Sequence, residues 1–101
     1  MDLRHAVATL DALSSESTLF AQRIAGRFLP ESRVVVLELS EADLKRPVGD
    51  VALERAPGTE YFLEVAIARE FLQGWMQSLH PAKPSVDQAL RCLIQYAEND
   101  A

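Results

Sequence analysis

The sequence is poor in the residues that form disulfides, metal centres and phosphate-binding loops. Cys92 is its only cysteine and cannot form an intrachain disulfide, which favours a reducing compartment. The only histidines, His5 and His80, are far apart and have no histidine neighbour, so we predict no metal site. The glycines are isolated, and no CxxC, HExxH or GxSxG motif occurs. We therefore expect no cofactor.

Long apolar runs and basic segments are also absent. No stretch of about 18 uncharged apolar residues occurs, so we expect no membrane-spanning helix. The first residues mix acidic and basic side chains, which is not typical of a signal peptide. The net charge is −5, and no third of the chain has more basic than acidic residues. Because nucleic-acid binding relies on basic residues that neutralise phosphates, we expect a cytoplasmic protein that binds neither membrane nor nucleic acid.

What the chain does contain is the composition of a small globular protein. Of its 101 residues, 49% are hydrophobic and 25% are charged, which is typical of a soluble domain rather than a disordered tail. A chain of this length can bury a core without disulfides or metals. No internal repeat or linker divides it. The sequence predicts a single small α+β domain over residues 1–101.

The densest apolar stretch runs from Glu60 to His80 and contains the only tryptophan. On a helix its apolar residues cover most of the circumference, while Arg69 lies on the polar face that we expect to meet solvent. Such a helix needs neighbours on several sides, so we interpret the stretch as the central helix of the fold. Apolar alternation over residues 61–66 also permits a strand that leads into a shorter helix from about Ala66. The helix is the preferred interpretation.

The N-terminal residues predict two helices. Apolar spacing from Asp2 to Leu13 is that of an amphipathic helix, with Asp2 as its cap. A serine-rich stretch interrupts it. A second helix is predicted from about Glu16 to Phe28, ended by Leu29-Pro30. The two can also form one kinked helix, and the sequence leaves that choice open.

The middle of the chain predicts a small antiparallel sheet. Arg33–Leu39 is the clearest strand, and its apolar residues on both faces indicate an interior strand or one covered on both sides. Ser40–Asp43 resembles a capped helical turn. Residues 51–56 are interpreted as a second strand that pairs with the first, although Asp50 as a cap equally permits a short helix.

The last predicted helix begins at Ser85, which forms a capping box with Gln88. Glu98 lies on its predicted solvent face. We expect this helix to fold back beside the central one. The predicted fold is therefore α+β: two N-terminal helices, a small antiparallel sheet of two or three strands, a long central helix and a C-terminal helix packed on it.

Two groups of apolar residues are candidates for an interface. The first group lies on the central helix. Core packing is the simpler interpretation of these residues, but aromatic residues and methionine are also enriched at interfaces. The second group lies on the predicted strand, because a sheet of two or three strands leaves open edges. We predict a homodimer on this basis. The candidate interface residues are Phe71, Trp75, Met76, Leu79, Val35 and Leu37.

The leading hypothesis for function is a non-enzymatic interaction protein: an adaptor, inhibitor or partner-binding subunit that acts through a surface and binds a protein partner. It follows because the sequence predicts a well-packed core but contains no recognisable set of catalytic residues. A cluster of acidic residues, Glu38, Glu41 and Asp43, is interpreted as a solvated loop with local capping rather than as a site.

The sequence also permits two other classes of function. The first is a small-molecule-binding protein or minor enzyme with a pocket between the sheet and the central helix, lined by Tyr61, Trp75, Cys92 or Tyr96. The second is a DNA-binding regulator in which the first two helices form a helix-turn-helix. The second of these helices offers too few cations to DNA, which makes this the weakest hypothesis.

Overall fold

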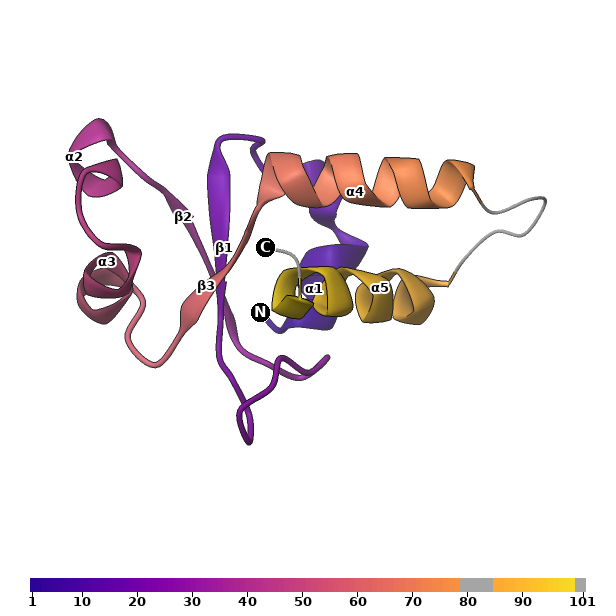
Figure 1. Ribbon diagram of the computed structural model, residues 1–101, viewed down its shortest axis with the longest axis horizontal. Coiled ribbons are helices and arrows are strands. Elements are labelled where there is room, and N and C mark those ends of the chain that lie inside the picture. Colours follow the sequence, from indigo (N-terminus) through magenta and orange to yellow (C-terminus); the bar gives the residue numbers. More distant parts are fainter. Residues whose placement is uncertain (79–84, 100–101) are drawn as a thin grey trace.

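The computed structural model describes residues 1–78 and 85–99 and shows an α+β fold. A three-stranded antiparallel sheet has the order β2-β1-β3, and helices cover both of its faces (Figure 1). The predicted α+β class, with a long helix and a C-terminal helix packed together, is confirmed. The elements in chain order are α1 (Leu3–Ala8), the 3-10 helix η1 (Leu10–Ala12), β1 (Ser17–Ala21), β2 (Val34–Glu38), α2 (Glu41–Leu44), α3 (Val48–Arg55), β3 (Glu60–Glu64), α4 (Val65–Gln77) and α5 (Val86–Asn99).

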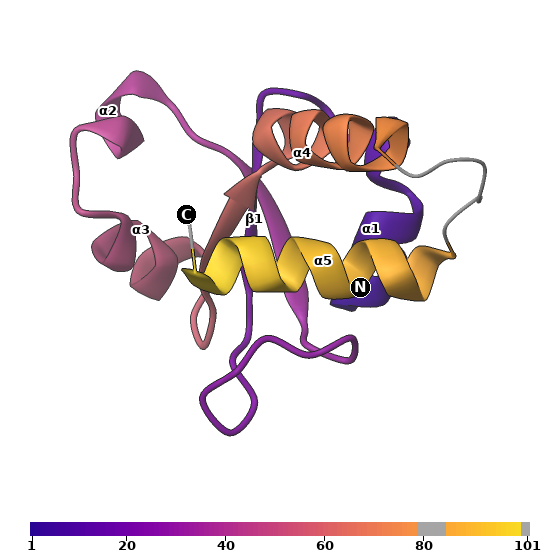
Figure 2. The ribbon, with the colours of Figure 1, turned by 45° about the vertical axis from the view of Figure 1, so that its right-hand side comes forward.

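The two faces of the sheet bury separate hydrophobic clusters. We call the face covered by α1, α4 and α5 the three-helix side, and the opposite face the α3 side (Figures 1 and 2). On the α3 side, Phe20 packs with Ala52 and Ala56. The buried cluster of the three-helix side is much larger and comprises Leu3, Ala6, Val7, Leu10, Leu19, Ala21, Phe28, Val34, Phe62, Leu63, Val65, Ala68, Leu72, Leu90 and Leu93.

The prediction of a second N-terminal helix from about Glu16 to Phe28 is wrong. Ser17–Ala21 instead forms β1, the central strand, which is buried along its whole length and pairs with both neighbours. The chain then turns through Ala25 and Gly26, which both have positive φ, a conformation that ends any helix. Hydrogen bonds to two strands and burial on both faces outweigh the local helical spacing.

The predicted helix over Glu60–His80 begins later than expected. Glu60–Glu64 forms β3, and the helix α4 starts at Val65, so the alternative of a strand leading into a shorter helix is correct. The pairing register shifts between Leu19 and Phe20 of β1, which matches a bulge in β3. This irregularity lets the consecutive residues Phe62 and Leu63 both join the core of the three-helix side.

The predicted strand Arg33–Leu39 is confirmed as β2, but it is an edge strand that pairs with β1. The expectation that it is covered on both sides is correct, because its residues pack alternately into the two clusters. The strand interpretation of residues 51–56 is wrong. Residues 51–55 belong to the helix α3, which buries Val51 and Ala52 and has Ala56 as its C-cap, and the short-helix alternative holds.

The predicted caps at Asp2, Ser40 and Ser85 are present, whereas Asp50 lies in the first turn of α3 and does not cap it, because Pro47 is the N-cap. The Asp2 carboxylate accepts a hydrogen bond from the His5 N–H at 2.8 Å, although α1 ends at Ala8 rather than near Leu13. Ser40 and Asp43 form a reciprocal capping box at α2, and Ser85 accepts from the Gln88 N–H at 3.2 Å at α5. In the described ranges 1–78 and 85–99, every helix is too short or too polar to cross a membrane.

Candidate functional site

The candidate interface residues of α4 have different environments. Phe71 is half-buried and stacks on Tyr96 of α5, with ring centroids 4.4 Å apart and planes inclined by 20°. Trp75 is half-buried and packs against the core, whereas the Met76 side chain is 51% exposed. Leu79 lies outside the described residues. Phe71 therefore joins the two helices, and among the described residues of this group Met76 is the one that is mostly exposed.

Trp75 and Met76 face two different hollows. Trp75 lines a hollow of about 240 Å³ with Cys92 and Tyr96. Met76 lines a groove of about 430 Å³ with Val86 and residues of α1 and η1. Three of the four residues predicted to line a ligand pocket thus share one hollow, which lies between α4 and α5. Its volume is below the range of about 300–1,000 Å³ that ligand sites usually have, and small-molecule binding there stays a prediction.

Tyr61, the fourth predicted pocket residue, lies elsewhere. Its ring meets Phe20 edge-on, at a centroid distance of 6.3 Å, within the cluster of the α3 side. Burial raises the pKa of Tyr61, and the negative charge of Glu64 adds to this effect. Tyr61 is therefore a packing residue of the sheet.

The two candidate interface residues of β2 lie on the α3 side. Val35 and Leu37 are half-buried and pack on the cluster around Phe20. The sheet separates them from the residues of α4, which lie on the three-helix side (Figure 1). The structure therefore does not bring the two groups together into one surface.

Among the described residues, the outer edge of β2 has backbone partners only near its start. The Leu3 N–H donates to the Ser32 carbonyl at 2.8 Å, and the Val34 N–H donates to the Met1 carbonyl at 2.8 Å. Because backbone groups alternate in direction along a strand, those of Val36 and Glu38 also point outward. No backbone partner for these two residues occurs among residues 1–78 and 85–99. We call residues 36–38 the open half of β2.

The segment that follows β2 exposes large apolar side chains, which the sequence reasoning missed. Leu44 of α2 is 65% exposed and Leu53 of α3 is 75% exposed, and Val48 is also exposed. A signal for Leu53 was present in the sequence, since on a helix it lies opposite the buried Val51 and Ala52. That signal was hidden by the strand interpretation of residues 51–56.

The charges of α2 and α3 neutralise one another. Arg46 lies 2.7 Å from Glu54, and Arg55 lies 2.6 Å from Asp43. The Ser40 backbone N–H donates to the Asp43 carboxylate, and together with the Ser40 hydroxyl, Arg55 and Arg46 it lowers the pKa of Asp43 below 3.8. Ion pairing with Glu54 raises the pKa of Arg46. Asp43, one of the three clustered acids, thus serves local structure.

Two charged side chains that were predicted to face solvent are structural. Arg69 of α4 donates to the carbonyls of Leu10 and Asp11, each at 3.0 Å, and to that of Leu13. Glu98 of α5 accepts a hydrogen bond from the Phe28 N–H at 3.2 Å. The expectation of solvent exposure is wrong for both, because Arg69 binds backbone carbonyls of η1 and its C-cap Leu13, and Glu98 satisfies the Phe28 N–H.

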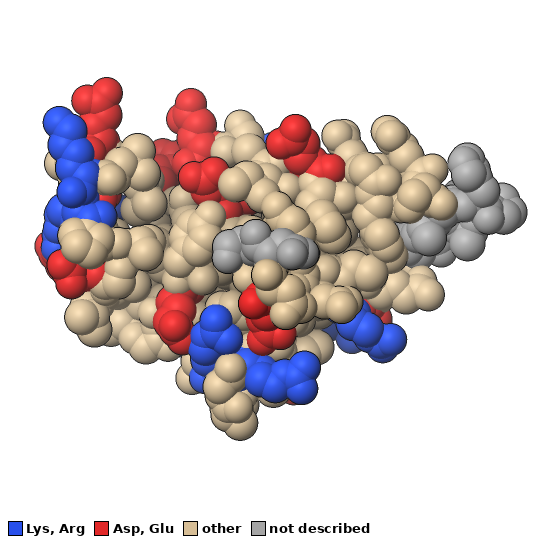
Figure 3. Space-filling view, in the orientation of Figure 1, with Lys and Arg blue, Asp and Glu red and all other residues tan. Residues whose placement is uncertain are grey.

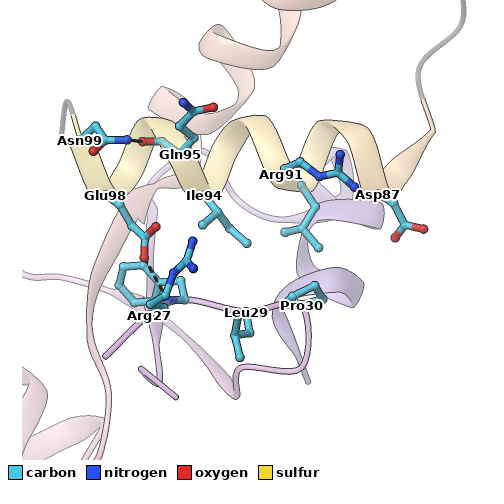
Figure 4. Close-up of a pocket in the computed structure, with 11 residues that line it drawn as sticks. Arg27, Leu29, Pro30, Asp87, Arg91, Ile94, Gln95, Glu98 and Asn99 are labelled. Atoms are coloured by element: carbon cyan, nitrogen blue, oxygen red, sulfur yellow. Dashed lines mark hydrogen bonds between the residues drawn. The ribbon is translucent and has the colours of Figure 1, made fainter. Parts of the chain in front are cut away.

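A groove lies between α5 and residues 27–30, and we call it the α5 groove. It has a volume of about 620 Å³. Figure 4 shows Ile94 pointing from α5 toward Leu29 and Pro30 on the opposite wall. Arg27 and Arg91 also line it. No local sequence pattern indicates this groove, because its two walls are far apart along the chain.

No metal centre or helix-turn-helix is formed by the part of the chain that the structure describes. Within residues 1–78 and 85–99, no three His, Cys, Asp or Glu side chains gather where they could hold a metal ion. The second helix that a helix-turn-helix would need is replaced by β1. Comparison with protein-family models, with curated proteins and with solved structures gives no match.

Proposed function

We propose that this protein is a non-enzymatic interaction protein that binds an extended polypeptide segment along the open half of β2. The observation that carries the proposal is the outward-facing backbone of Val36 and Glu38, which has no backbone partner among the described residues. Such an edge is a template for another strand, and strand addition is a common way to bind a peptide.

The start of the same edge supports this proposal. Met1 and Leu3 hydrogen-bond to Val34 and Ser32, so the chain itself uses the first half of the edge for pairing. The pairing stops before Val36. A bound segment would extend the sheet from that point.

Side chains near the open half of β2 can add apolar contact. Each backbone hydrogen bond contributes only about 0.5–1.5 kcal/mol, so a short edge needs further burial for stable binding. α2 follows β2 directly, and its exposed Leu44 is a candidate for this role. We expect a partner segment with apolar side chains.

The predicted homodimer is one form of the same interaction. Two copies of β2 can pair antiparallel about a two-fold axis, with Val36 of one copy opposite Glu38 of the other. The exposed Glu38 side chains then come close to the axis, and their like charges weaken self-association relative to binding of a neutral or basic segment.

A proline at position 38 tests the edge directly. Glu38→Pro removes one outward N–H and leaves the ladder with β1 intact, because proline is tolerated on an edge strand whose N–H faces outward. Glu38→Ala is the matched control, because it removes the same side chain and keeps the N–H.

Two measurements read out the effect. Light scattering at high protein concentration should show a dimer for the native chain and for Glu38→Ala, and a monomer for Glu38→Pro. A pull-down from native lysate should recover a stoichiometric partner with the first two baits only. A native chain that is monomeric and recovers no such partner contradicts the proposal.

A further inference from the structure

We propose that the α5 groove binds a small anionic amphiphile, meaning a carboxylate or phosphate carried on an apolar body. The site is separate from the open half of β2, and the proposal stands whether or not that edge binds a polypeptide. It rests on the apolar floor of the groove and on the two arginines that line it.

The floor of the α5 groove is apolar and firmly held. Phe28 and Leu90 are 2% and 1% exposed, and both belong to the core of the three-helix side. Phe28 packs edge-on against Phe62 with ring centroids 5.0 Å apart. Ile94 reaches into the groove above Leu29 and Pro30 (Figure 4). The volume of about 620 Å³ lies within the usual range of ligand sites, about 300–1,000 Å³.

The carboxylates that line the α5 groove already have partners. Asp87 lies 2.9 Å from Arg4. Glu98 accepts from the Phe28 N–H, and its carboxylate is 3.9 Å from Arg23. Arg23 is further paired with Glu60 at 2.9 Å and stacks over the Phe28 ring at 4.2 Å.

The two arginines that line the α5 groove are not neutralised in this way. Neither Arg27 nor Arg91 has a carboxylate within 4.0 Å in the described ranges 1–78 and 85–99. In Figure 3, Lys and Arg side chains lie along the lower edge of the molecule, with Asp and Glu side chains beside them. A protein of net charge −5 therefore has a groove with two available cations.

The chemistry of the α5 groove selects an anion with an apolar body. A guanidinium group pairs well with a carboxylate or phosphate, because its N–H donors match two oxygens. The apolar floor adds a hydrophobic contribution to the binding of a ligand with an apolar body, and a bare inorganic anion would not gain this contribution. Two arginines are too few for a nucleic-acid backbone, which requires several phosphate contacts.

Decanoate is a suitable probe, with decanol and decylammonium as matched controls of the same chain length. Titrations followed by amide NMR should show decanoate shifting the signals of Leu29, Leu90 and Ile94. Decanol should bind about tenfold more weakly, because it lacks the charge, and decylammonium should not bind there. Equal binding of decanoate and decanol would overturn the proposal, as would shifts confined to the hollow beside Trp75.

Two substitutions test the arginines separately. Arg27→Gln and Arg91→Gln should each weaken decanoate binding about three- to tenfold, because each removes one exposed charge-assisted contact. Lys45→Gln, at the C-cap of α2, makes the same change in net charge away from the groove and should have no effect. The amide spectrum of each variant shows whether the fold is kept.

The result that overturns the role of the arginines is decanoate binding that neither Arg→Gln variant changes. A peptide of alternating leucine and glutamate serves as a second probe. If the peptide binds in the α5 groove and decanoate does not, the occupant is a polypeptide and the proposal fails.

Discussion

The three-helix side and the α3 side of the sheet are built from the same strands but buried to different extents. On the three-helix side, α1, α4 and α5 enclose a large cluster that includes Phe28, Phe62 and Leu93. On the α3 side, the buried cluster consists of Phe20 with two alanines, Ala52 and Ala56. α2, which is attached to α3, buries none of its own residues.

Because of this difference, one side of the sheet supplies most of the stability of the fold, and the other side is the more exposed. Since buried apolar area is the main stabilising contribution, most of the free energy of folding comes from the three-helix side. The α3 side depends more on caps and surface ion pairs, and segments with few buried contacts open more readily. The open half of β2 lies beside this weaker cover, whereas the floor of the α5 groove belongs to the stronger core.

The largest expected effect is a difference in the free energy of unfolding between the same Leu→Ala substitution on the two sides of the sheet. Leu93→Ala should lower the free energy of unfolding by about 2–5 kcal/mol, because Leu93 is fully buried and its loss leaves a cavity. Leu53→Ala on α3 should change it by less than about 0.5 kcal/mol, because Leu53 is mostly exposed. Urea unfolding measures both. Equal losses would show that the two sides contribute alike.

A smaller difference in the free energy of unfolding is expected between substitutions of two arginines. Arg69→Gln should lower the free energy of unfolding by about 1–3 kcal/mol, because the carbonyls of Leu10, Asp11 and Leu13 lose a shared donor. Arg46→Gln on the other side breaks an exposed pair with Glu54 and should change it little. Thermal unfolding of both variants at one pH is the measurement. A greater loss for Arg46→Gln contradicts the comparison.

The next effect depends on pH. The folded state lowers the pKa of Asp43, so its carboxylate stabilises α2 fully above pH 3.8, the ordinary value, and this contribution is lost as the pH falls through the lower folded value. Amide NMR during acid titration should therefore show this transition at Ser40 and α2 only as the pH falls below 3.8. Asp43→Asn should remove this acid transition. A transition at Ser40 and α2 that is complete above pH 3.8, or that persists in Asp43→Asn, contradicts the prediction.

Local signals in the sequence were enough to predict several elements. The caps at Asp2, Ser40 and Ser85 depend on residues within one helical turn, so they could be recognised without knowing the fold. The strand β2 was identified from its run of β-branched residues.

Elements that depend on distant pairing could not be predicted in this way. β1 has Phe20 at a helical spacing from later apolar residues, and it becomes a strand because β2 and β3 pair with both of its edges. The start of β3 at Glu60 is decided by the same long-range contact. The α5 groove is formed by Arg27 and Arg91 from opposite walls, and no local pattern relates them.

The smallest expected effect lies at alkaline pH and concerns Tyr61, which packs edge-on against Phe20 on the α3 side. Burial raises the pKa of Tyr61, so the protonated phenol stabilises the fold fully below pH 10.0, and this contribution is lost as the pH rises above that value. Urea unfolding at about pH 9 and about pH 11 should show a decrease in stability. Tyr61→Phe keeps the ring and removes the titrating group, so its decrease should be smaller by the contribution of this one phenol. If the native chain and Tyr61→Phe lose the same stability, alkaline sensitivity arises elsewhere, and the weaker cover of the α3 side is not its source.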